Sequence, residues 1–253
     1  MAEDSYIVTG AAGGMGSEAV RQLARRGVNV LCVDRDEESL KALADRLPPH
    51  EGDIVCHVAD VTEREQVEAY VRAAVDRWGG LAGAFHIAGH EGVMRRFVDA
   101  DIDEFDRMIA INARSVWYGM KYVVPHLLAR GGGSIVNTGS YVASHGTQHT
   151  SPYGAAKHAV VGMTRGVAVE LAALDVRVNV LAPGAMDTRM IRTLWTQTSP
   201  DDPERGHALT VGRIPRGKLA DPANVAKVGV FLLLDAPPEM TGQIVSVDGA
   251  RSA

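Results

Sequence analysis

The sequence predicts an α/β fold, a single domain in which a doubly wound parallel sheet of about seven strands carries helices on both faces. Two observations predict it: short apolar runs alternate with helical patterns along the whole chain, and a glycine-rich turn follows the first run. Such alternation requires parallel strands joined by right-handed crossovers. The chain has 253 residues, 46% of them hydrophobic. It can therefore bury one substantial core, and the domain is expected to span 1–253.

The expected strands are apolar runs that are too continuously apolar to face water on either side. In chain order they lie at about 5–9, 28–33, 53–58, 82–87, 133–138, 176–181 and 243–247. Helical patterns fill the intervals near 14–26, 36–46, 63–77, 104–129, 153–173 and 222–234. The segment at about 187–218 has weak periodicity and several prolines.

The first predicted strand, turn and helix indicate a phosphate-binding site. In the segment Y-I-V-T-G-A-A-G-G-M-G-S, Gly10, Gly14 and Gly16 let the backbone turn tightly and approach a pyrophosphate. The pyrophosphate then lies at a helix N-terminus, where free N–H groups favour negative charge. Asp34, near the end of the second run, can accept hydrogen bonds from the adenosine ribose hydroxyls. A plain strand-to-helix turn, and a helix N-cap at Asp34, are the structural alternatives.

A second motif, S-P-Y-G-A-A-K, places Tyr153 and Lys157 four residues apart, so that a helix over 153–173 stacks them on one face. Ser140 lies upstream, at the end of the apolar run S-I-V-N-T-G-S. Because a neighbouring ammonium stabilises phenolate, Lys157 is expected to lower the pKa of Tyr153 and make it a proton-transfer group. Taken alone, this spacing also occurs by chance in many helices.

Together these motifs resemble the short-chain dehydrogenase/reductase family, and the likeness covers nearly the whole chain. The matching segments, in chain order, are T-G-A-A-G-G-M-G, Ala59-Asp60-Val61, Asn112 in M-I-A-I-N-A, the trio of Ser140, Tyr153 and Lys157, Pro183-Gly184 with Thr188, and V-D-G-A near the C-terminus. One segment departs from the family: its N-N-A-G after the fourth strand is His86-Ile87-Ala88-Gly89 here. The Asn side chains that tie that loop to its neighbours are therefore absent.

The resemblance implies a Rossmann-type fold and hydride transfer between a nicotinamide cofactor and a secondary alcohol or ketone, with Tyr153 as general acid or base. It further implies that Ser140 hydrogen-bonds the substrate oxygen, that Lys157 holds the nicotinamide ribose, and that Asn112 positions a water that relays the proton. The implied cofactor-binding residues are Gly10, Gly14, Met15, Gly16, Asp34, Arg35, Asp60, Val61, Ala88, Gly89, Tyr153, Lys157, Pro183, Gly184, Met186 and Thr188.

Two other functions remain open at this point. One is a dihydrodiol-acid dehydrogenase that forms an aromatic acid, of the 2,3-dihydro-2,3-dihydroxybenzoate type, which shares the chemistry and differs in substrate. The other is a non-catalytic nucleotide-sensing protein on the same fold, since fold does not fix function. The presence of Ser140, Tyr153 and Lys157 argues against the second.

The choice of cofactor depends on Asp34, which favours NAD over NADP. A carboxylate about 4 Å from the extra phosphate of NADP would be repelled by roughly 4 kcal/mol per unit charge at an effective dielectric of about 20. Arg35 would favour NADP instead, because a guanidinium can pair with a 2'-phosphate. We interpret Arg35 as a solvated surface residue and expect NAD.

The substrate pocket is expected beneath the segment at about 187–218, where the family carries a mobile lid. Predicted substrate contacts are Tyr141, His145, Gln148 and His149 after the catalytic serine, and Met190, Leu194 and Trp195 in the lid. The alternative for the lid residues is the core of a short helix. Arg189 or Arg192 could meet a substrate carboxylate. No metal site is predicted, because Gly146 breaks the helix that would align the two imidazoles of H-G-T-Q-H.

Composition excludes several partners. A net charge of −5 without a long basic run argues against nucleic acid. No apolar stretch is long enough to cross a membrane and no signal-like N-terminus occurs, so a cytoplasmic protein is expected. Cys32 and Cys56 fall in predicted strands and are expected to be buried, inert thiols. From the resemblance we expect a homotetramer built through the helices near 104–129 and 153–173, where Ala155, Ala159 and Gly162 permit close packing.

Overall fold

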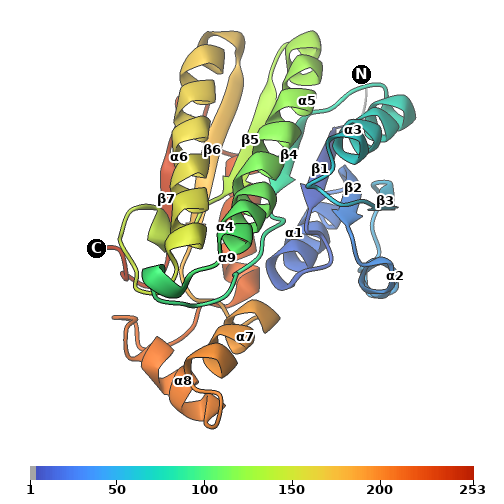
Figure 1. Cartoon of the computed structure of the whole chain (residues 1–253). Helices are drawn as coiled ribbons and strands as arrows, with labels where there is room; N and C mark the ends of the chain where they lie inside the picture. Colours follow the sequence, from blue (N-terminus) through green and yellow to red (C-terminus); the bar gives the residue numbers. More distant parts are fainter. Residues whose placement is uncertain (1–3) are drawn as a thin grey trace.

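The computed structural model describes residues 4–253, which form one seven-stranded sheet whose paired strands all run parallel, in the order β3-β2-β1-β4-β5-β6-β7. Its strands are β1 Ser5–Thr9, β2 Asn29–Asp34, β3 Ile54–Val58, β4 Gly83–His86, β5 Gly133–Thr138, β6 Val176–Pro183 and β7 Ile244–Val247. The predicted fold class is confirmed (Figure 1). The order of the strands reverses at β1, which pairs with both β2 and β4, and the crevice beside such a switch point is where ligands bind in this kind of sheet.

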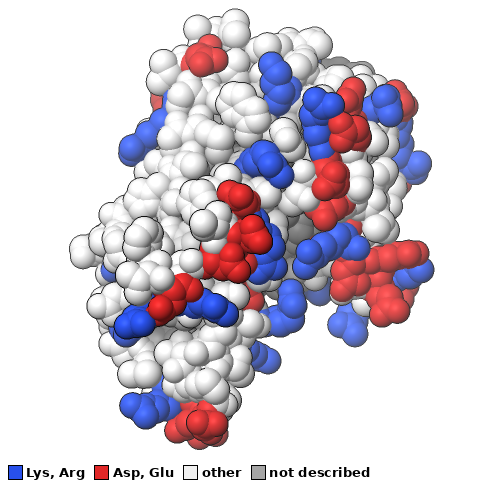
Figure 2. Space-filling view, in the orientation of Figure 1, with Lys and Arg blue, Asp and Glu red and all other residues white. Residues whose placement is uncertain are grey.

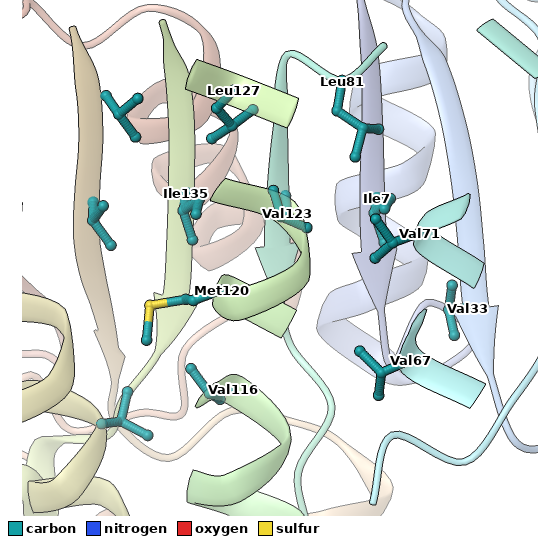
Figure 3. Packing of buried hydrophobic residues seen from close by; sticks show 14 of the residues in the cluster. Ile7, Val33, Val67, Val71, Leu81, Val116, Met120, Val123, Leu127 and Ile135 are labelled. Carbon is teal, nitrogen blue, oxygen red and sulfur yellow. The ribbon is translucent and has the colours of Figure 1, made fainter. Parts of the chain in front are cut away.

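Helices cover both faces of the sheet, and each face has its own apolar core. One core lies against α3 (Arg64–Trp78), α5 (Ser115–Arg130) and α6 (Ser151–Leu171), and Figure 3 shows part of it, with Val67 and Val71 of α3 facing Ile7 of β1. The other core lies against α1 (Gly14–Ala24), α2 (Glu37–Ala44) and α9 (Pro222–Leu234). Burial on both faces explains why the central strands are apolar at every position.

The helix predicted over 104–129 is divided in the structure. It consists of α4 (Ile102–Ile109), a π-helical turn over Ala110–Arg114 and α5. Two side chains bond backbone carbonyls in this region: Asn112 Nδ2 donates to Met108 O at 3.3 Å and Ser115 Oγ donates to Ile111 O at 2.6 Å. Such bulges occur frequently at functional sites, and this one carries Asn112.

The segment at about 187–218 contains two helices, α7 (Arg189–Thr198) and α8 (Pro203–Val211), which lie apart from the sheet at the lower end of Figure 1. The α8 helix begins where Asp202 accepts a hydrogen bond from Arg205 N at 3.0 Å and Pro203 supplies the preset first turn. Short 3₁₀ turns occur at Phe97–Asp99, Tyr141–Ala143 and Ala172–Leu174.

Two predictions are wrong for the edge strand β3. Val58 is 50% exposed and Cys56 is exposed, so this strand does not avoid water on both faces and Cys56 is not a buried thiol. The reason is its place at the end of the sheet, where no further strand covers its outer side. Cys32, its partner in the register of β2, is buried as expected.

Across residues 4–253, none of the helices combines the length and apolar character that a membrane span needs. Over the same residues, no three or more His, Cys, Asp or Glu side chains gather in a way that would hold a metal ion.

Candidate active site

A cavity of about 790 Å³ opens at the carboxyl ends of the strands. It is lined by segments that follow β1, β2, β3, β4, β5 and β6, together with the lid helices. All the predicted catalytic and cofactor residues line it: Asn112, Ser140, Tyr153 and Lys157, and Gly10, Gly14, Met15, Gly16, Asp34, Arg35, Asp60, Val61, Ala88, Gly89, Pro183, Gly184, Met186 and Thr188. The structure therefore brings together residues that the sequence spreads over most of the chain.

The glycine-rich turn after β1 fits a phosphate group. Gly10 has φ +66°, a left-handed conformation, and a Cβ there would lie 2.7 Å from Ala88 N. A Cβ at Gly16 would overlap the carbonyl oxygen of Gly10. The first turn of α1 carries no acidic residue and no side chain caps it. Its N–H groups are therefore free to face an anion that approaches the backbone closely.

Asp34 stands at the end of β2 with its carboxylate held by the backbone. Oδ2 accepts from Ala12 N at 3.1 Å and Oδ1 accepts from Asp36 N at 3.2 Å, so the carboxylate links the turn after β1 to the start of the next loop. The neighbouring Arg35 is exposed and lines the same cavity. Asp60, after β3, instead caps its own turn, accepting from Thr62 N at 2.8 Å.

At residue 86, where the chain departs from the family's N-N-A-G segment, a buried histidine packs beside a glycine. His86 is buried, and its Nδ1 lies 2.8 Å from Oδ1 of Asn137 on the neighbouring strand, whereas Nε2 has no partner in the described chain. Burial lowers the pKa of His86 to about 4, so the imidazole is neutral. A Cβ at Gly119 would overlap this ring, so the glycine provides the space that the larger side chain needs.

The loop after β4 is tied down without the family's Asn pair. Ile87 N donates to Thr9 Oγ1 at 3.2 Å. Further along, Asn112 Oδ1 accepts from His90 N at 3.1 Å and Asn112 Nδ2 donates to His90 O at 3.0 Å. The buried amide of Asn112 thus holds the backbone of this loop from both its donor and its acceptor side.

Tyr153 and Lys157 lie on one face of α6, with the ammonium 5.6 Å from the centre of the phenol ring. Lys157 is buried and donates to Thr138 O at 2.8 Å, and burial lowers its pKa to about 8. The expected lowering of the phenol pKa is wrong for this structure. Burial raises the pKa of Tyr153 to about 12, and the Ser140 hydroxyl, which hydrogen-bonds the phenol, opposes this only in part.

The predicted substrate residues divide into two groups. Tyr141, Gln148, His149, Met190 and Leu194 line the cavity, as does Arg189. Three others, His145, Trp195 and Arg192, do not line it.

Each of these three has a different partner. His145 is exposed and bonds Ser144 Oγ through Nδ1 at 2.8 Å. Trp195 packs between the two lid helices, donates to Thr210 Oγ1 at 3.1 Å and meets His207 edge-on, so the helix-core alternative is correct for it. Arg192 pairs with Asp187 at 2.9 Å.

Sequence reasoning missed four residues at this end of the cavity. Glu91, Arg213 and Arg251 line it, and Gln197 of α7 fastens the lid to the loop after β4 by accepting from Met94 N at 2.7 Å and donating to Gly92 O at 3.1 Å. Arg251 directly follows the matched segment V-D-G-A and Glu91 lies two residues after Ala88-Gly89, which was the available signal. Nothing in the sequence around Arg213 or Gln197 pointed to the cavity.

Comparisons with known proteins agree with this arrangement. The family model described as Enoyl-(Acyl carrier protein) reductase matches residues 10–250. Levodione reductase from Leifsonia aquatica is 34% identical over 98% of this chain and 93% of its own. For cyclohexanol dehydrogenase from Acinetobacter sp. (strain SE19) the identity is 36%, over 98% of this chain and 94% of the relative.

Solved structures give the same result. The crystal structure of levodione reductase has a TM-score of 0.96 at 33% identity, covering 100% of this chain and 98% of that one. A variant of actinorhodin polyketide ketoreductase with NADPH has a TM-score of 0.92 at 29% identity, covering 100% of this chain and 99% of that one. The likeness that the motifs indicated extends over the whole fold. The chain belongs to the short-chain dehydrogenase/reductase family.

Proposed function

We propose that this chain is an NAD(H)-dependent oxidoreductase that interconverts a secondary alcohol and a ketone. The observation that supports it is the meeting of Tyr153, Ser140 and Lys157 in the same cavity as the glycine-rich turn and Asp34. The names of two relatives, levodione reductase and cyclohexanol dehydrogenase, indicate substrates with a cyclic body. The apolar lid residues Met190 and Leu194 suit such a body.

A nicotinamide dinucleotide fits the residues present. At Gly10 and Gly16 no side chain covers the turn, so the pyrophosphate can approach the backbone closely. Asp34 would bind the adenosine ribose, and Lys157 would bind the nicotinamide ribose. When bound, the cofactor supplies or accepts the hydride. The preference for NAD rests on the Asp34 carboxylate, which would repel a 2'-phosphate, while Arg35 is exposed nearby.

The chain's own residues handle the proton. With a pKa raised to about 12, Tyr153 carries its proton at neutral pH and is ready to donate it to a carbonyl oxygen during reduction. Ser140 hydrogen-bonds the same oxygen, and its bond to the phenol keeps the two hydroxyls together. Lys157, with a pKa of about 8, is mostly protonated at neutral pH and stabilises phenolate after the transfer. Asn112 positions a water that returns the proton from solvent.

The test is Tyr153→Phe, assayed with a panel of cyclic ketones, alcohols and a dihydrodiol acid by following NADH absorbance. The variant should lose roughly hundredfold to ten-thousandfold in turnover, the usual contribution of a general acid, while it binds NADH as the parent does. Tyr122→Phe on α5, whose phenol does not line the cavity, is the matched control and should keep full activity. Undiminished turnover by Tyr153→Phe would refute the proposal.

Assembly into a homotetramer is part of the same proposal. Ala155, Ala159 and Gly162 lie exposed on α6, and the surface over α5 and α6 in Figure 2 carries few charged side chains. Helices can approach closely across such small residues. Sedimentation of the parent and of Ala159→Arg should show a tetramer only for the parent.

A further inference from the structure

Two arginines from distant parts of the chain meet beside Tyr141, the residue after Ser140. Arg213 follows α8 and Arg251 follows β7, and both line the cavity. The guanidinium carbon of Arg251 lies 4.0 Å from the centre of the Tyr141 ring, a close cation–π contact. Both positive charges act on this phenol: burial raises the pKa of Tyr141, and Arg251 and then Arg213 oppose the rise.

Neither guanidinium has an anionic partner in the described part of the chain. No ion pair or side-chain hydrogen bond within residues 4–253 involves Arg213 or Arg251. Arg251 is half-buried, and burial lowers its pKa. The charge of Asp248 raises the pKa of Arg251, but by less than the like charge of Arg213 lowers it. Asp248 Oδ2 also accepts a hydrogen bond from Ser252 N at 3.0 Å. A half-buried cation beside a second cation is costly unless an anion joins them.

A carboxylate, that of Glu91, lines the cavity at the end of a different strand. Glu91 follows β4 whereas Arg251 follows β7, so Ser140 and Tyr141 after β5 lie between them in the strand order. The Glu91 side chain is only 9% exposed, and its charge raises the pKa of Tyr153. His90 does not neutralise it, because the two groups are 4.0 Å apart and His90 Nδ1 accepts a hydrogen bond from Gly92 N. A negatively charged substrate group is thus repelled from one side and attracted to the other.

We infer that Arg213 and Arg251 bind an anionic substituent, a carboxylate or a group of similar charge, on the ketone or alcohol substrate. The Arg251 guanidinium lies over the Tyr141 ring, and its N–H groups make no hydrogen bond within residues 4–253, so they are available to an anion. The substrate class is then an oxo acid or hydroxy acid with a cyclic body. This inference deepens the proposed function and rests on it.

The decisive experiment compares two ketones that differ by one charge, 4-oxocyclohexanecarboxylate and its methyl ester. The parent should prefer the carboxylate in kcat/KM by about tenfold to a hundredfold, the range of a charge-assisted hydrogen bond. Arg251→Gln and Arg213→Gln should each reduce this preference, because kcat/KM should fall more for the carboxylate than for the ester. Arg251→Lys keeps the positive charge but lacks the paired N–H donors of the planar guanidinium. This variant should therefore retain part of the preference for the carboxylate.

Arg216→Gln is the matched control. Arg216 lies near the same turn, its N–H donating to Gly249 O at 3.2 Å, and it does not line the cavity. It should leave the preference intact. Equal use of the two ketones by the parent, or a preference that survives loss of both cavity arginines, would overturn the inference.

A binding measurement separates this result from the proposed function. If the parent turns over no member of the panel, the proposed function fails. In that case, or if only these two ketones are not reduced, benzoate serves as a probe in calorimetric titrations of the parent and of the variant lacking both cavity arginines. Weaker binding by the variant by about tenfold would support the anion site, whereas equal binding would refute it.

Discussion

The two ends of the cavity are built by different means. The cofactor end consists of backbone: a turn after β1, the N-terminus of α1 and a carboxylate fixed by the amides of Ala12 and Asp36. The substrate end consists of side chains that arrive from β5, the lid and the end of the chain, such as Tyr141, Arg213 and Arg251. A site made of backbone tolerates little change, whereas one made of side chains can change its ligand residue by residue. The predictions below test this difference.

On binding, the largest effect is expected at the cofactor end, from Gly16→Ala. Its Cβ would overlap the carbonyl oxygen of Gly10, a backbone atom that cannot rotate away. Overpacking of this kind costs up to about 3 kcal/mol, which corresponds to roughly a hundredfold weaker NADH binding in fluorescence titrations. Gly166→Ala on α6, where a Cβ meets nothing within 4 Å, is the control and should bind normally. Unchanged binding by Gly16→Ala would show that the turn is not a rigid cradle.

The second prediction concerns pH and the phenol between the two ends. Oxidation needs Tyr153 without its proton, and with a pKa raised to about 12 the fraction of phenolate rises about tenfold per pH unit below that value. We therefore expect kcat/KM for the alcohol to rise about tenfold between pH 7 and 8. Reduction uses the protonated phenol, so its kcat/KM should stay flat over this interval and decline above about pH 8 as Lys157 loses its charge. A plateau for oxidation already at pH 7 would contradict the raised phenol pKa.

A smaller effect is expected from Asp34→Ala with Arg35 retained. Removal of the carboxylate takes away the repulsion of a 2'-phosphate and leaves the exposed guanidinium of Arg35 to attract it. The ratio of kcat/KM for NADPH over NADH should rise roughly fivefold to tenfold in steady-state kinetics. Because Asp34 also accepts from Ala12 N, the thermal stability of the variant has to be measured alongside. An unchanged cofactor ratio would refute this role for Asp34.

The cofactor end could be predicted from the sequence because its geometry is local. The glycines of the turn follow β1 and Asp34 ends β2, and a strand, a turn and a helix have few ways to connect. The same holds for Tyr153 and Lys157, whose helical spacing places them on one face.

The substrate end could not be predicted in the same way. Contact between Arg251 and Tyr141 depends on where the last turn of the chain meets the end of β5, and no local pattern encodes this. The π-helical turn at Asn112 could not be predicted either. Over a few residues, the apolar periodicity of a sequence does not distinguish a π-helical hydrogen-bond spacing from an α-helical one. Likewise the rise in the pKa of Tyr153 follows from burial by many neighbours, not from the Lys157 spacing alone.

The smallest effect is expected at His86, which lies buried at the end of β4. In the unfolded chain a histidine has a pKa near 6.5, whereas burial lowers the pKa of His86 to about 4 in the folded protein. The unfolded state therefore binds more protons between these values, so the stability that the neutral imidazole contributes is complete above pH 6.5 and is lost as pH falls towards 4. Between pH 6 and 5 the loss is roughly 1 kcal/mol.

His86→Asn isolates this loss, because every other titrating group is shared by the two proteins. The free energy of unfolding in urea, measured at pH 7, 6 and 5, should fall more steeply for the parent than for the variant by that amount. The variant should start from a lower stability at pH 7, since the smaller amide leaves unfilled the space that Gly119 provides. Parallel pH profiles for the two proteins would contradict the lowered pKa of His86, because they require the imidazole to bind protons equally in the folded and unfolded states.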